Sequence, residues 1–305
     1  MLVRPAAFGF NAETAVSNVF QQVPAAAAED STVTAQREFD SLQRALQSEG
    51  IDCCVLRDEA PPRRPDAVFP NNWISFHADG TVVLYPMAAP SRRLERRSEW
   101  IATVCEHTGF IERRRLDLSG EESAGHFLEG TGSLVLDHTH RRAYACRSPR
   151  TDAGLVVEWA RLMDYEPVLF DALDESGRPY YHTNVLMWIG ARAACVCLEA
   201  VPSPAGERLR ELLSQDRDLL EIDRRQVRAF AGNMLQLASW DEALGDCEVL
   251  VMSASARAAL SAAQWLRLSA LTDNRLVIPI PAIEQVGGGS VRCMLAEVPR
   301  QEADR

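Results

Sequence analysis

An internal repeat constrains the fold of this 305-residue chain more than any other feature of its sequence. Amphipathic helical segments alternate with short β-rich runs, at intervals of about 50 to 60 residues. We count five such units. The predicted helices cover 33–49, 91–108, 151–163, 204–214 and 255–269, and the strands that follow them cover 51–57, 110–116, 165–170, 218–222 and 275–280. Five similar units can close radially about an axis, so we expect one toroidal α/β domain over residues 1–305 rather than two separate domains.

Paired strands with turn signals lie between the predicted helices. Residues 73–77 and 81–85 flank Asp79-Gly80, and residues 185–189 and 193–197 flank Gly190. These patterns are typical of antiparallel hairpins and not of a parallel strand pair joined by a helix. In a radial arrangement, the inner strand ends and their loops meet at a central channel, where we expect the functional residues to lie.

Charge excludes several classes of protein. The net charge of −11 disfavours nucleic acid and anionic membranes as partners. One candidate for a basic stripe lies on a predicted helix and comprises Arg92, Arg93, Arg96 and Arg97. Because Glu95 and Glu99 are interleaved with these arginines, we interpret it as a solvated helix face. All 32 basic residues are arginine. Without lysine, neither a lysine Schiff base nor a P-loop phosphate site can form.

Neither a membrane span nor a signal peptide is indicated, because no run of about 18 apolar residues exists and the strand-like start lacks a charged leader pattern. We therefore expect a cytoplasmic protein, with homo-oligomerisation left open. In that compartment most of the eight scattered cysteines should be free thiols. Core packing is the simplest interpretation of Cys53, Cys54, Cys195 and Cys197.

No metal or other cofactor is expected. His138 and His140 would supply half of a metal site, but they lie in a predicted hairpin turn with no further cysteine or histidine at ligand spacing.

Three residues suggest nucleophilic catalysis. Cys293 follows the glycine cluster 287–289, which is predicted to be a flexible loop that feeds a strand and lets the backbone approach a crowded site. A plain surface loop before a buried cysteine is the alternative. His182 and Glu129 each lie at the predicted start of an apolar strand, although a lone histidine there is often only structural. Together they fit a cysteine hydrolase, in which an imidazolium stabilises the thiolate and a carboxylate orients the imidazole.

Five ordered motifs extend this pattern through the whole chain. They are Asp66-Ala-Val-Phe-Pro-Asn-Asn72, Phe127-Leu-Glu-Gly-Thr-Gly132, Arg147-Ser-Pro-Arg-Thr151, His182-Thr-Asn184 and Gly287-Gly-Gly-Ser-Val-Arg-Cys293. The set resembles the guanidino-group-modifying, or pentein, superfamily, which includes arginine deiminases, dimethylarginine hydrolases and amidinotransferases. The segments 4–11 and 69–73 look most like its citrulline-utilisation hydrolase branch. The resemblance implies a five-bladed α/β propeller, in agreement with the repeat count.

The resemblance also implies a role for each matched residue. Cys293 is then the nucleophile, His182 the proton donor and acceptor, and Glu129 the carboxylate that binds a substrate nitrogen and orients the site. Arg150 matches an arginine that binds a substrate α-carboxylate, which its planar guanidinium could do bidentately; a solvent-exposed flank of the following helix is its alternative. Asp66 lines the site or caps a turn.

Two departures from the deiminase pattern concern the substrate, a small ureido or guanidino amino acid. Deiminases carry aspartates where this chain has Asn72 and Asn184. Neutral amides cannot compensate a buried guanidinium, whereas they complement an uncharged ureido group. The expected reaction therefore converts citrulline or a similar amino acid to ornithine, ammonia and carbon dioxide. One alternative is that one or both asparagines are only structural. Two further alternatives concern the whole protein, which could be an arginine deiminase or amidinotransferase, or a non-catalytic binding member of the fold.

Overall fold

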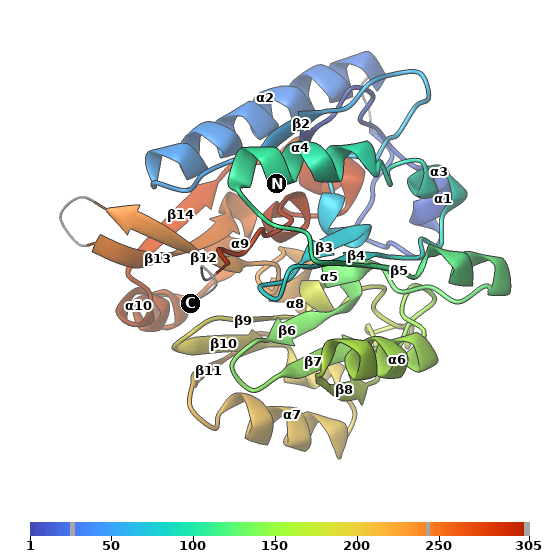
Figure 1. Cartoon of the computed structure of the whole chain (residues 1–305). Coiled ribbons are helices and arrows are strands. Elements are labelled where there is room, and N and C mark those ends of the chain that lie inside the picture. The colour runs from blue at the N-terminus through green and yellow to red at the C-terminus, as the bar shows by residue number, and fades with distance from the viewer. Residues whose placement is uncertain (25–27, 242–244, 302–305) are drawn as a thin grey trace.

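The computed structural model describes residues 1–24, 28–241 and 245–301. Within this part of the chain the strands form five sheets, one for each predicted unit (Figure 1). They are β1 (Leu2–Arg4) with β2 (Val55–Arg57); β3 (Ile74–Phe76), β4 (Thr81–Leu84) and β5 (Arg114–Asp117); β6 (Val135–Asp137), β7 (Arg142–Cys146) and β8 (Glu166–Phe170); β9 (Met187–Ile189), β10 (Ala193–Val196) and β11 (Asp218–Glu221); and β12 (Leu235–Asp241), β13 (Gly245–Ser253) and β14 (Asn274–Ile278).

Each three-stranded sheet is built in the same way. An antiparallel hairpin comes first, and its second strand then pairs in parallel with a third strand that follows a helical connection. The principal connecting helices are α4 (Glu99–Thr108), α6 (Ala153–Met163), α7 (Ala205–Leu213) and α10 (Ala262–Leu271), and α2 (Ala28–Ser48) connects β1 to its parallel partner β2. The predicted hairpins are confirmed, and a parallel third strand completes each of the four three-stranded units. The fold is the five-bladed α/β propeller of the pentein class.

The two ends of the described chain meet and complete the first blade. The amino group of Met1 donates to the carbonyl oxygen of Ala296 at 2.9 Å, and the Ala296 amide donates back to the Met1 carbonyl at 3.1 Å. The C-terminal segment is therefore joined to the start of the chain, next to β1, by this pair of backbone hydrogen bonds. This contact holds the segment that carries Cys293 against the first blade.

The connecting helices bury one face, as their periodicity predicts. In α6, the residues Leu155, Val156, Trp159 and Met163 are all buried, and Asp152 caps the helix by accepting from the Leu155 amide at 2.9 Å. A large apolar side chain stabilises the fold by about 1.5–3 kcal/mol when fully buried. These helices therefore fix the outer part of each blade, while the inner strand ends stay available for the site.

Two predicted helices are interrupted. The segment 91–108 forms α3 (Pro90–Arg93) and α4, and the segment 255–269 forms α9 (Ala254–Ala259) and α10. The remaining short helices are α1 (Ala12–Ala15), α5 (Gly130–Ser133) and α8 (Arg224–Arg228). Serine side chains at 253 and 261 cap α9 and α10 separately, which explains the second break.

The predicted solvated face around Arg92 is wrong for two of its residues. Arg92 and Glu95 are 2% and 1% exposed and form a bidentate ion pair, whereas Leu94 between them is 48% exposed. The cause is the break after α3, which turns this short helix away from the orientation of α4. Arg92 consequently faces the interior of the propeller.

The described cysteines are all free thiols, as predicted. Burial raises the pKa of Cys197 to about 12 and that of Cys53 to about 11. Such thiols stay protonated at neutral pH, and their side chains pack in the hydrophobic core. Among the described helices, none combines the length and apolar character needed to cross a membrane.

Candidate active site

Five short turns of similar sequence lie around the site, four of them just before the first strand of a three-stranded sheet and the fifth in the C-terminal segment. The turns contain Asn72-Trp-Ile74, Gly132-Ser-Leu134, Asn184-Val-Leu186, Asn233-Met-Leu235 and Cys293-Met-Leu295. A polar or small residue is followed two positions later by a buried aliphatic one in every case, which anchors the turn. The glycine cluster 287–289 was predicted to feed a strand, but it leads instead into the 3-10 turn Val291–Met294, which carries Cys293. His182 and Glu129 likewise precede a helical turn and not a strand.

Cys293 and His182 line one small buried cavity of about 20 Å³. The other lining residues include Asp66, Asn72, Arg92 and Arg150, with contributions from 14, 18, 69, 181 and 287–289. A space of this size holds about one water molecule. The structure therefore brings five of the seven predicted residues to one cavity, while Glu129 and Asn184 contact His182 and Cys293 without lining it.

His182 and Glu129 form a buried hydrogen-bonded pair. Nε2 of His182 lies 2.8 Å from Oε2 of Glu129, and their side chains are 2% and 0% exposed. Burial by itself raises the pKa of Glu129, but the Arg150 guanidinium and the hydrogen bond from His182 outweigh it and lower that pKa well below its usual range. An ionised carboxylate only accepts hydrogen bonds, so Nε2 must carry the hydrogen. Nδ1 of His182 is thus left as the basic nitrogen.

Gly132 makes room for this imidazole. A Cβ atom at Gly132 would lie 2.7 Å from Nδ1 of His182 and 2.5 Å from Nδ2 of Asn72. Contacts this short do not occur between real Cβ atoms and their neighbours. The glycine of the third blade therefore creates the space in which Nδ1 lies, a role that the sequence pattern did not indicate.

Burial lowers the pKa of His182 to about 4, although the hydrogen bond to Glu129 works in the opposite direction. The neutral imidazole, which can accept a proton, therefore persists down to this pH. We expect kcat/KM to fall as pH decreases through about 4, rather than through the ordinary histidine value of about 6.5.

Initial rates after brief pH jumps, with circular dichroism to show that the protein is still folded, would measure this limb. An acid limb centred near the ordinary value would contradict a neutral, buried His182.

Cys293 is contacted by amides. Nδ2 of Asn184 lies 3.5 Å from its Sγ atom, and Nδ2 of Asn233 lies 3.4 Å away. Among the described residues, these two asparagines make the hydrogen bonds to Sγ, and His182 is not one of the partners. The direct contact between Sγ and the imidazole that a thiolate–imidazolium pair requires is therefore not observed among the described residues. Asn184, predicted to line the substrate pocket, instead lies behind the nucleophile.

Arg150 is buried in the site and not exposed on a helix flank. Its guanidinium lies 3.4 Å from the Glu129 carboxylate, donates to the Thr14 carbonyl at 2.6 Å and to Ser17 at 2.8 Å, and stacks 4.9 Å above the ring of Tyr181. A substrate carboxylate would have to replace the contact with Thr14. The predicted role of Arg150 in binding a carboxylate stays a prediction.

Asp66, Asn72 and Arg92 form a polar group on the opposite wall. Arg92 donates to Oδ1 of Asn72 at 2.6 Å and lies 3.9 Å from Asp66. Nδ2 of Asn72 and Oδ1 of Asp66 are buried without a hydrogen-bond partner among the described residues. Unsatisfied buried polar atoms are rare and costly, so these two atoms mark where a polar ligand group would bind. Arg92 was missed because a basic residue in a charged helix usually faces solvent.

The segment 11–22 covers this cavity. Asn18 and Gln21 donate to the carbonyls of Gly288 and Gly287, each at 3.1 Å, and Asn11 donates to Asp66 at 2.7 Å. Gly288, at φ 65°, has no space for a Cβ because Asn18 and Gln21 lie directly against it, so the glycine cluster contacts the covering segment.

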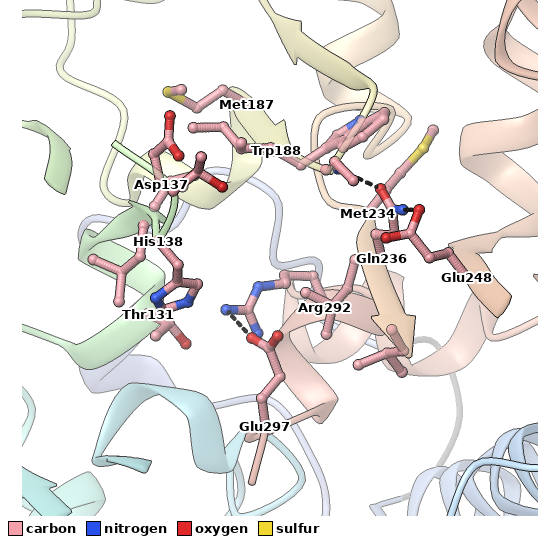
Figure 2. Close-up of a pocket in the computed structure, with 18 of the residues that line it drawn as sticks. Thr131, Asp137, His138, Met187, Trp188, Met234, Gln236, Glu248, Arg292 and Glu297 are labelled. Atoms are coloured by element: carbon pink, nitrogen blue, oxygen red, sulfur yellow. Dashed lines mark hydrogen bonds and ion pairs between the residues drawn. The ribbon is translucent and has the colours of Figure 1, made fainter. Parts of the chain in front are cut away.

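A second cavity of about 260 Å³ is lined by Arg292, the residue that precedes Cys293 (Figure 2). Arg292 points into it and pairs with Glu297 at 3.2 Å, and Met234 lines it as well. Arg292 precedes Cys293 in the sequence and Met234 follows Asn233, and Cys293 and Asn233 contact each other. The turns of the first and fifth blades thus separate the two cavities.

The histidines that suggested half of a metal site have other partners. His138 bonds to Tyr165 at 2.7 Å, and His140 bonds to Asp137 at 2.9 Å. Within the described ranges, no group of three or more potential ligands could hold a metal ion.

Residues 4–300 match the family described as N,N dimethylarginine dimethylhydrolase, eukaryotic. No curated protein sequence matches the chain significantly. Solved structures do share its fold. The apo structure of ArgZ, an arginine dihydrolase from the ornithine–ammonia cycle in cyanobacteria, superposes with a TM-score of 0.71 at 15% identity, over 98% of this chain and 40% of that one.

Two further structures cover most of both chains. The N-terminal domain of an ArgZ variant, covalently bound to a reaction intermediate, gives a TM-score of 0.71 at 16% identity, over 98% of this chain and 97% of that one. A dimethylarginine dimethylaminohydrolase adduct with 4-chloro-2-hydroxymethylpyridine gives 0.57 at 18% identity, over 86% and 90%. The citrulline-utilisation branch is not tested by these similarities. The chain belongs to the dimethylarginine dimethylhydrolase family, within the guanidino-group-modifying, or pentein, superfamily.

Proposed function

We propose that this protein is a cysteine-dependent hydrolase that cleaves the ureido group of citrulline or a similar amino acid. The observation that carries the choice of substrate is the orientation of Asn72. The Arg92 guanidinium has only donors, so the Asn72 atom 2.6 Å from it must be the oxygen. The amide therefore presents its N–H groups, which have no partner among the described residues, to the cavity.

A donor in this place complements a ureido carbonyl, which accepts hydrogen bonds. A guanidinium carries only donors and would face the N–H groups of Asn72 unpaired. The anionic compensation that a guanidinium needs is also reduced. Asp66 is already engaged with Arg92 and Asn11, and Glu129 with His182 and Arg150. A neutral ureido group fits this site better than a cation.

The proposed reaction begins when neutral His182 accepts the thiol proton of Cys293 through Nδ1. Sγ forms a bond to the ureido carbon, and the carbonyl π electrons move to oxygen. The tetrahedral intermediate collapses with cleavage of a C–N bond, and His182 protonates the departing nitrogen. His182 then accepts a proton from the water that hydrolyses the thiocarbamate. Release of carbamate, which breaks down to ammonia and carbon dioxide, leaves ornithine when the substrate is citrulline. Departure of ammonia first would give the same net products.

A second candidate is an arginine deiminase or dihydrolase. Its support is the carboxylate of Asp66, which lines the cavity, and that of Glu129, which contacts His182 and Arg150 of the lining, together with the arginine dihydrolase fold relatives. We propose one catalytic domain over residues 1–305. Cytoplasmic location, lack of nucleic-acid and membrane partners, independence from cofactors and any homo-oligomer stay predictions.

Steady-state kinetics on the two substrates would decide between the candidates. We expect kcat/KM for citrulline, or for another ureido amino acid, to exceed that for arginine by at least ~100-fold, which corresponds to about 2.7 kcal/mol. Equal or greater efficiency on arginine would show that Asn72 does not set the charge preference, and would favour the deiminase.

A further inference from the structure

Asn233 is a buried amide beside the nucleophile that the proposed reaction has not used. Its side chain is completely buried, and its Nδ2 lies 3.4 Å from Sγ of Cys293. The same Nδ2 donates to the backbone oxygen of Asn184 at 2.9 Å. A carbonyl oxygen only accepts, so the atom facing it must be nitrogen. The two hydrogens of Nδ2 are therefore directed to the Asn184 carbonyl and to Sγ.

The backbone around Asn233 holds this amide in place. The Asn233 amide donates to the Phe230 carbonyl at 2.8 Å, and a Cβ at Gly232 would come within 2.3 Å of the Val185 carbonyl oxygen. The turns of the fourth and fifth blades therefore contact each other directly through backbone. A side chain locked in this manner is pre-organised, which is what stabilisation of a developing charge requires.

The need for such a donor follows from the rest of the site. His182 bonds to Glu129 and is kept neutral by burial, so no imidazolium contacts Sγ in the resting site. A buried thiolate without hydrogen-bond donors would be strongly disfavoured. Oδ1 of Asn233 lies 3.7 Å from Sγ and can accept from the neutral thiol. The same amide can thus contact both the thiol and the thiolate.

We propose that Asn233 is a positioning residue that stabilises the Cys293 thiolate through one N–H group and aligns Asn184 behind it through the other. The inference rests on Cys293 being the nucleophile, as proposed above. Asn184 completes a pair of amide donors around Sγ. Hydrogen bonds to a charged acceptor are stronger than those to a neutral one, so the pair favours the thiolate that attacks the ureido carbon.

The test compares the wild-type enzyme with Asn233→Asp and Asn233→Ala. The aspartate keeps the shape of the side chain but replaces the N–H groups with oxygen, and the alanine removes the contact altogether. The ultraviolet absorbance of the thiolate is titrated in each protein, and the titration of the same protein carrying Cys293→Ala is subtracted to isolate this one cysteine. We expect the midpoint to move to higher pH by about one unit or more in Asn233→Asp, a tenfold smaller thiolate fraction, and in the same direction in Asn233→Ala.

Circular dichroism would establish that each variant is folded, and kcat should fall more than KM rises. An unchanged midpoint in the folded variants would overturn the proposal. Asn233 would then have only a structural role, through its hydrogen bond to the Asn184 carbonyl in the fourth blade. If Asn233→Asp does not fold, the midpoint of Asn233→Ala decides alone. The titration requires no substrate, so its outcome is distinguishable from failure of the proposed ureido specificity.

Discussion

Replacement of Cys293 by alanine is expected to reduce turnover at least ~10⁴-fold and to leave the protein folded. The side chain is 3% exposed and lines the cavity with His182. Alanine removes the sulfur atom that we propose forms the covalent intermediate, while the turn Val291–Met294 loses a single buried atom. The measurement is kcat on the best ureido substrate, with the melting temperature as a check of folding.

Cys197→Ala provides a matched control for this variant. Cys197 is completely buried in the core, and burial raises its pKa to about 12. Its replacement should lower stability by about 1 kcal/mol and leave kcat near the wild-type value. Retention of ordinary activity by Cys293→Ala on every ureido and guanidino substrate would refute covalent catalysis by this residue.

Replacement of Glu129 by glutamine is expected to lower kcat by at least ~10³-fold. The carboxylate fixes the hydrogen of His182 on Nε2, 2.8 Å away. A glutamine amide can donate to Nε2 and thereby place the hydrogen on Nδ1, where it blocks proton acceptance. Arg150, 3.4 Å from the same carboxylate, would also lose its charged partner. The kinetic constants and the pH profile of the variant would be measured together.

Glu122→Gln is the corresponding control, because Glu122 forms ion pairs with Arg93 and Arg96 but does not line the cavity. This change should affect stability more than kcat. A Glu129→Gln enzyme with wild-type kcat would show that His182 does not depend on the carboxylate for its tautomer.

The propeller could be predicted from the sequence because its evidence is repeated. Each helix–strand unit is marked by amphipathic periodicity and turn residues such as Asp79-Gly80, and five ordered motifs place the same residues in the pentein pattern. Single errors in a boundary, such as the break between α3 and α4, therefore do not change the architecture. The parallel third strand of the four three-stranded blades was less visible, because short strands such as β5 and β11 carry too few residues to show which neighbour they join.

The site was predictable only where a residue type is unusual in its context. Cys293 stood out because it follows a glycine cluster, and His182 because it precedes what the sequence predicts to be a strand. Both residues line the cavity. Arg92 was assigned to solvent because its neighbours are charged, and only the three-dimensional turn of α3 shows that it contacts Asn72. Asn233 resembles an ordinary turn residue. Its proximity to Cys293, 60 positions away, depends on closure of the ring.

The most direct test of the account is mass spectrometry of enzyme that is acid-quenched during its first turnover, with citrulline and arginine supplied separately. The account predicts a citrulline-dependent covalent adduct on the peptide that contains Cys293, which disappears on completion of turnover and is absent from Cys293→Ala. Turnover of citrulline with unmodified Cys293 at every quench time, or an adduct that forms with arginine alone, would contradict attack by Cys293 on a ureido carbon.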